Sequence, residues 1–90
     1  MMKHINIRVT GRVQGVGYRM SCNMAARQMS VTGFVKNEYD GSVYIEAEGE
    51  EENLSVFTAW CRKGPDHAYV EDLNITEGEM KNFDAFEVSY

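Results

Sequence analysis

A glycine-rich loop that ends in an arginine is the segment of this sequence best equipped for chemistry. It reads Gly11-Arg12-Val13-Gln14-Gly15-Val16-Gly17-Tyr18-Arg19. Its glycines allow several backbone N–H groups to turn into one concavity, and a helix that begins near Arg19 adds unpaired N–H groups and its positive dipole end. The Arg19 side chain offers a planar fork of donors that matches phosphate oxygens. The spacing alone fits an anion site and an ordinary strand-to-helix turn equally well.

The loop differs from the two common nucleotide-binding loops. No Gly-Lys-Ser/Thr sequence occurs, so the loop is not a G-x-x-x-x-G-K-[ST] motif. Met20 stands three residues beyond Gly17, where the dinucleotide-binding pattern G-x-G-x-x-G requires a third glycine. The loop therefore gives no reason to expect a nucleotide.

The charges divide sharply along the chain. Residues 1–37 carry six basic residues and no acidic one, a charge of +6, whereas residues 38–90 carry three basic and fourteen acidic residues, a charge of −11. A basic part within a protein of net charge −5 suggests a small local anion site, because nucleic-acid binders present a broadly basic face. Chance sorting of solvated charges is the alternative.

The elements around the loop follow from periodicity. Ile5, Ile7 and Val9 alternate with polar residues and predict a strand, and a helix from about Arg19 places Cys22, Ala25, Ala26 and Met29 on one face, with Tyr18 and Met24 nearby. A second strand is expected over 33–37. The Asp-Gly pair in Tyr39-Asp40-Gly41-Ser42 predicts a hairpin turn, and a third strand over 43–48 follows it.

The second half of the sequence predicts one more helix and two more strands. Glu50, Glu51 and Glu52 suit a helix N-terminus, and Gly64-Pro65 ends that helix; its apolar face holds Leu54, Phe57 and Cys61, with Val56 and Trp60. A strand is expected over 68–75, with a bulge because Val70 and Leu73 are an odd number of residues apart. A closing strand contains Phe86, Val88 and Tyr90. The order predicts an α+β fold, a ferredoxin-like α/β sandwich (βαββαβ) with an antiparallel sheet and two helices on one face.

Two segments resemble the signatures of the acylphosphatase family. The loop Gly11 to Arg19 is similar to the first, and Gly33-Phe34-Val35-Lys36-Asn37 with Asp40-Gly41 and Val43 is similar to the second. Gly64-Pro65 and Ala68-x-Val70 resemble weaker landmarks. The resemblance extends from about Ile5 to Tyr90 and implies a ferredoxin-like fold and hydrolysis of acyl phosphates to a carboxylate and inorganic phosphate.

The resemblance also implies roles for residues. The backbone cradle for phosphate corresponds to Gln14, Gly15, Val16, Gly17, Tyr18 and Arg19, the phosphate-binding arginine to Arg19, and the catalytic asparagine that holds the attacking water to Asn37. Ser89 replaces a basic residue that many members carry near the C-terminus, which leaves any charge pairing there open. A non-enzymatic anion-binding module on the same fold is the alternative function. A similar domain also opens larger carbamoyl-transfer maturation proteins, but 90 residues are too few for the remainder of such a protein.

Other reactive residues have simpler interpretations. Cys22 lies near a helix start, where the pKa of a thiol can fall, but its place on the apolar face favours a buried structural cysteine, as for Cys61. We place His4 before the first strand and His67 in a loop, and neither has partners at metal-ligand spacing. The glutamates at 50–52 suit a helix start better than a cation. We therefore expect no metal and no cofactor.

Length and composition limit the remaining classes. The 90 residues predict a single domain over 1–90, with 43% hydrophobic and 26% charged residues, as in ordinary globular domains. No transmembrane stretch or signal peptide is evident, and two cysteines are too few for a disulfide framework, which favours a cytoplasmic protein. We expect a monomer whose ligands are a small acyl phosphate and inorganic phosphate. The acidic charge and the lack of an aromatic-basic strand motif argue against nucleic acid.

Overall fold

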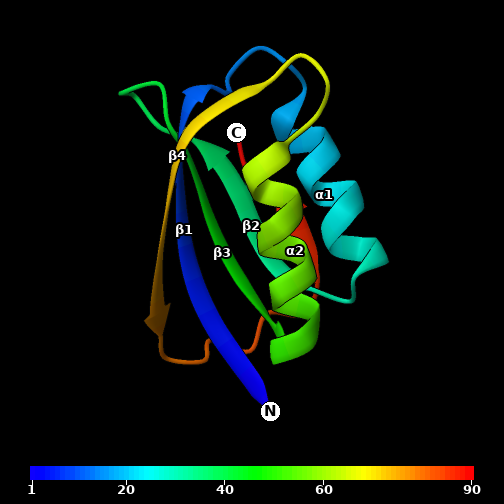
Figure 1. Ribbon diagram of the computed structural model, residues 1–90. Coiled ribbons are helices and arrows are strands. Elements are labelled where there is room, and N and C mark those ends of the chain that lie inside the picture. Colours follow the sequence, from blue (N-terminus) through cyan, green and yellow to red (C-terminus); the bar gives the residue numbers. More distant parts are fainter.

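A computed structural model describes residues 1–90 as one sheet with two helices packed on one of its faces (Figure 1). The elements in chain order are β1 (Met2–Arg12), α1 (Tyr18–Gln28), β2 (Thr32–Asn37), β3 (Val43–Glu50), α2 (Glu51–Lys63), β4 (Tyr69–Gly78) and β5 (Phe86–Val88). This order and the two-layer architecture confirm the predicted ferredoxin-like fold. No helix is long and apolar enough to cross a membrane.

The sheet has the strand order β4-β1-β3-β2-β5. The first four strands pair antiparallel, as predicted for the βαββαβ core. β5 differs, because it adds to the outer edge of β2 in parallel, with Gly33 opposite Phe86 and Val35 opposite Val88. The sheet is therefore mixed. Periodicity identifies β5 as a strand but carries no signal for its direction, which depends on the connection that precedes it.

The hydrophobic core fills the space between the sheet and the helices. The strands contribute alternate residues, including Ile7, Val9, Val35 and Ile45, each 0% exposed. The helices contribute the predicted faces: Tyr18, Cys22, Ala25 and Ala26 from α1, and Leu54, Phe57 and Cys61 from α2. Met24 and Val56 were expected beside these faces, but both are exposed. A straight helix can bury only one side against the sheet, and these two residues lie beyond it.

β4 contains the irregularity that the sequence predicts. Its pairing with β1 shifts register between Thr10 and Gly11, which lie opposite Asp72 and Val70, so Glu71 is the extra residue. The shift explains how Val70 and Leu73 can both approach the core although they are an odd number of residues apart. The expected bulge is confirmed.

The sheet face opposite the helices carries a buried polar cluster. His4 belongs to β1 rather than to the segment before it, and its side chain is 1% exposed. His4 Nδ1 donates to Glu48 Oε2 over 2.7 Å, and its Nε2 lies 2.8 Å from Asn6 Oδ1. Residues 79–85, which we call the strap, connect β4 to β5 and cover this cluster. Alternation along β1 and β3 places His4 and Glu48 on the sheet face opposite the helices. These side chains are buried because the strap covers that face.

Acid should therefore destabilise this fold through the buried carboxylates. Burial raises the pKa of Glu48, but hydrogen bonds from the backbone of Lys81 and from His4 outweigh this effect, so the pKa lies below the ordinary 4.5. The pKa of Glu46 is lowered in the same way, because its bonds from Lys81 and Tyr44 outweigh its burial. In the unfolded chain both groups bind protons at higher pH than in the folded one. Their stabilisation is thus complete above about pH 4.5 and is lost as pH falls through the folded pKa values.

Urea unfolding measured between pH 7 and pH 3 checks this dependence. The free energy of unfolding should fall on acidification, and Glu48→Gln should show a weaker fall than the parent because one titrating carboxylate is gone. Equal slopes in the two proteins would show that Glu48 does not contribute.

Candidate active site

The loop between β1 and α1 has the backbone conformation that an anion cradle needs. Gly15 and Gly17 have φ angles of 74° and 80°, in the left-handed region that glycine adopts without strain. Gly17 is also the N-terminal cap of α1, and no side chain caps the helix there. The first N–H groups of α1 have no acceptor within the helix, so they and the positive end of the helix dipole are available to an anion.

A hollow of about 110 Å³ lies at this helix end. It is lined by Val13, Gly15, Gly17, Tyr18, Arg19, Met20 and Asn37. The hollow joins the loop after β1 to the end of β2, two segments that are distant in sequence but belong to neighbouring parts of the fold. Its size leaves room for a phosphate group and a water, since about 10–15 Å³ of such space is enough to hold one water.

Arg19 lines this hollow from the first turn of α1, and the C-terminal residues Ser89 and Tyr90 contact its guanidinium. Its Nη1 donates to the backbone oxygen of Ser89 over 2.9 Å, and its guanidinium carbon lies 4.7 Å from the ring centroid of Tyr90. That hydrogen bond is the only one its guanidinium makes, which leaves its remaining N–H groups for a ligand. A cation stacked on an aromatic ring gains electrostatic stabilisation and loses freedom to rotate.

Asn37 reaches the hollow from the last position of β2. Its Oδ1 is the only buried side-chain polar atom in the protein that lacks a hydrogen-bond partner. A buried acceptor without a donor costs about 1–3 kcal/mol, so such atoms in a folded protein point to a missing partner. Asn37 lines the hollow, so a small side-chain movement would let a water there supply that donor.

Gln14 connects the loop to the hairpin that follows Asn37. Its Nε2 donates to the backbone oxygens of Glu38 and Ser42, both over 2.8 Å. In the same turn, the hydroxyl and N–H of Ser42 lower the pKa of Asp40, with a smaller contribution from Arg8. The Gln14 bridge fixes the separation between the loop and the β2 end.

The structure brings most of the predicted site residues together. Gly15, Gly17, Tyr18, Arg19 and Asn37 line the hollow, whereas Gln14 and Val16 do not. The Gln14 side chain turns to the hairpin, and Val16 packs against the core. Sequence reasoning did not assign Val13, Met20 or Tyr90 to the site, and it noted Ser89 only as the replacement of a basic residue. Met20 could have been found from its place beside Arg19, but no local pattern connects residues 89 and 90 to a loop seventy residues earlier.

The cysteines and the remaining histidine lie outside this chemistry. Cys22 is completely buried, and burial raises the pKa of its thiol well above the ordinary value, which disfavours a thiolate nucleophile. Burial raises the pKa of Tyr18 as well, and its hydroxyl donates to the Cys61 backbone oxygen over 2.7 Å. His67 is exposed, and no three His, Cys, Asp or Glu side chains cluster as metal ligands do.

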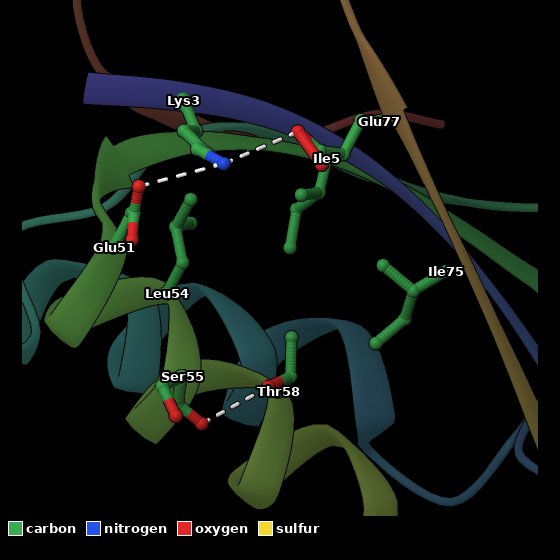
Figure 2. A pocket seen from close by; sticks show the side chains of 8 residues that line it. All are labelled: Lys3, Ile5, Glu51, Leu54, Ser55, Thr58, Ile75 and Glu77. Carbon is green, nitrogen blue, oxygen red and sulfur yellow. Dashed lines mark hydrogen bonds and ion pairs between the residues drawn. The ribbon is translucent and has the colours of Figure 1, made fainter. Parts of the chain in front are cut away.

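A second hollow, of about 280 Å³, lies between α2, β1 and β4 and is unsuited to a phosphate (Figure 2). Its interior is apolar, with Ile5, Leu54 and Ile75. Its one cation, Lys3, is already paired with Glu51 and Glu77, at 3.4 and 3.5 Å. With two carboxylates to one ammonium, the rim of this groove repels an anion.

Known proteins match this chain along nearly its whole length, in sequence and in fold. The sequence model of the acylphosphatase family matches residues 5–88. An acylphosphatase of Oceanobacillus iheyensis is 44% identical over 99% of this chain and 100% of its own, and one of Archaeoglobus fulgidus is 42% identical over 96% and 97%. The crystal structure of acylphosphatase from Bacillus subtilis superimposes with a TM-score of 0.95 at 37% identity, and each chain is covered completely. The chain belongs to the acylphosphatase family.

Proposed function

We propose that this protein hydrolyses acyl phosphates to a carboxylate and inorganic phosphate in the hollow at the N-terminus of α1. One observation carries the proposal: Asn37, whose buried Oδ1 has no partner in the protein, and Arg19, whose guanidinium has unused donors, line the same hollow. A site that only binds an anion needs donors such as those of Arg19, and it has no use for a buried acceptor. A hydrolase needs both, because the acceptor holds the attacking water.

The loop and Arg19 hold the phosphoryl group in this scheme. Backbone N–H groups of residues 14–19 and the guanidinium donate to its oxygens, and fixed donors stabilise the charge of the transition state without reorganising. An acyl phosphate is already activated, with a carboxylate as a good leaving group, so phosphoryl transfer can rest on positioning and charge stabilisation.

Asn37 positions the nucleophile. An amide does not accept a proton at neutral pH, but its oxygen accepts a hydrogen bond from water and aims it for in-line attack. The water oxygen forms a bond to phosphorus while the bond from phosphorus to the acyl oxygen breaks. The electron pair leaves on the carboxylate, and the proton passes to the phosphoryl oxygens of the substrate, since no side-chain base lines the hollow.

The proposal also covers the domain extent, the ligands, the oligomeric state and the location of the protein. Residues 1–90 act as one domain, and the ligands are the small acyl phosphate and inorganic phosphate, without cofactor or nucleic acid. A monomer in the cytoplasm is the working state. The net charge of −5 supports the exclusion of nucleic acid, because polyanions are repelled by an acidic surface.

Turnover of a simple acyl phosphate in the presence of excess EDTA tests the function. Because Arg19 and backbone N–H groups supply all the charge stabilisation in this scheme, the rate should be the same with and without chelator. A matched assay with added magnesium controls for metal carried through purification. No turnover would refute the hydrolase, and a rate that collapses with EDTA and returns with magnesium would refute this mechanism.

A further inference from the structure

The strap is attached to the sheet by a carboxylate that is far from the proposed active site. Glu48 Oε2 accepts the N–H of Lys81 over 2.6 Å, and Glu48 Oε1 accepts the N–H of Phe83 over 3.1 Å. With His4 as third donor, every contact of this 1%-exposed carboxylate is to the strap or to β1. Figure 1 shows the strap, in orange, passing the end of the sheet where the chain begins.

We propose that Glu48 is a positioning residue for the hydrolysis, acting on Arg19 through the strap and β5. This inference rests on the proposed function, because it concerns the arginine that binds the phosphoryl group. Glu48 touches neither substrate nor the hollow. Its effect is to fix where the strap ends and therefore where the backbone that holds Arg19 lies.

The first step of the connection runs from the strap into the sheet. Ala85, the last residue of the strap, accepts the N–H of Gly33 over 3.0 Å, and this contact starts the parallel pairing of β5 with β2. The pairing is only three residues long. So short an edge strand has few hydrogen bonds of its own. The attachments at its two ends therefore add to the buried Phe86 side chain and the Arg27 bond to the Phe86 oxygen in setting its register.

The second step runs from β5 to Arg19. Ser89 donates its N–H to the oxygen of Val35 over 2.8 Å, and its own carbonyl oxygen accepts the bond from Arg19 Nη1. Tyr90 then places its ring against the guanidinium. A displacement of β5 along β2 therefore moves the carbonyl and the ring together, and Arg19 loses the support that aims its free donors into the hollow.

Glu46 provides a matched control on the same strand and face. Its Oε1 accepts from the Lys81 ammonium over 2.8 Å and its Oε2 from the Tyr44 hydroxyl over 2.7 Å. His4 Nε2 also lies 3.5 Å from Oε1. All three contacts are to side chains, so Glu46 does not bind the strap backbone. Replacing either glutamate with glutamine removes one negative charge from the cluster, but only Glu48→Gln places an NH₂ group against strap N–H donors.

Binding of inorganic phosphate, measured by calorimetry well below each variant's Tm, tests the inference together with steady-state kinetics on an acyl phosphate. In Glu48→Gln we expect the phosphate Kd and the KM to rise by about fivefold, within the range of measured couplings between remote residues, with a smaller change in kcat. In Glu46→Gln both should change less than twofold. The Arg19 guanidinium NMR signal should shift in Glu48→Gln and stay in place in Glu46→Gln.

Two results would overturn the inference. A lowered Tm with unchanged Kd, KM and Arg19 signal would make Glu48 purely structural, and equal effects of the two variants would assign the change to charge alone. If Glu48→Gln does not fold, Lys81→Pro can replace it, because proline lacks the N–H that Glu48 accepts, and Lys81→Ala, which keeps that N–H, is its control. The phosphate Kd should then rise in Lys81→Pro and change less than twofold in Lys81→Ala. Phosphate binding and the NMR signal report on Glu48 even if the protein turns over no acyl phosphate, so this test fails separately from the proposed function.

Discussion

Replacing Arg19 with alanine should abolish measurable turnover. The guanidinium faces the hollow with donors that the protein itself does not use, so its removal takes charge from the bound phosphoryl group and from the transition state alike. Arginines that stabilise phosphoryl transfer are worth about a thousandfold or more in rate, so kcat/KM should fall by at least that factor. Inhibition by inorganic phosphate should weaken in parallel, which steady-state assays with added phosphate measure directly.

Arg19→Lys is the informative companion variant. Lysine keeps the positive charge but replaces a planar fork with a point charge on a flexible stem. Its three tetrahedral N–H donors do not match the geometry in which the guanidinium holds the Ser89 oxygen and faces the phosphoryl oxygens. Little activity should return. A lysine variant with nearly normal kcat/KM would contradict the role given to the guanidinium.

Asn37→Ala should lose turnover while keeping phosphate affinity. The amide oxygen has no partner in the protein, so its removal costs the fold little but leaves the attacking water without its acceptor. The kcat should fall on the order of a hundredfold or more with KM little changed, as expected for an interaction made mainly in the transition state. Phosphate should still protect this variant against heat, because a ligand that binds only the folded state adds about 2.7 kcal/mol at a hundred times its Kd.

The comparison with Arg19→Ala separates a hydrolase from a simple anion-binding module. Thermal protection by phosphate should persist in Asn37→Ala and vanish in Arg19→Ala. If Asn37→Ala turns over acyl phosphate normally, the water is held elsewhere. If it loses protection as completely as Arg19→Ala, Asn37 belongs to the anion cradle instead.

Local sequence patterns predicted the elements of this fold because their causes are local. Alternation, helical periodicity and turn residues each act within a few positions, and the odd spacing of Val70 and Leu73 predicted the bulge at Glu71 for the same reason. The direction of β5 and the burial of His4 were not predictable in this way. Both depend on the strap, which packs against residues more than thirty positions away.

In the candidate site, too, the residues with local sequence signals were predictable and those that depend on long-range contacts were not. The residue types of the loop from Gly11 to Arg19 are compatible with an anion site within nine positions. The resemblance to a family then implies the roles of Arg19 and Asn37. Neither carries a signal for the Ser89 carbonyl or the Tyr90 ring, because contacts made by a backbone oxygen and a stacked ring require no particular spacing. The fold was needed to find what supports the arginine.

The bridge from Gln14 to the hairpin base has a consequence for loop engineering. A single amide group spans the backbone oxygens of Glu38 and Ser42, and the same two residues are joined by the bond from the Glu38 N–H to the Ser42 oxygen. The base of the hairpin is thus fixed in length and width, whereas the exposed tip at Tyr39 to Gly41 is not held by the loop. Residues grafted into the tip should therefore lengthen the hairpin without altering the spacing between the loop and Asn37 that the proposed mechanism requires.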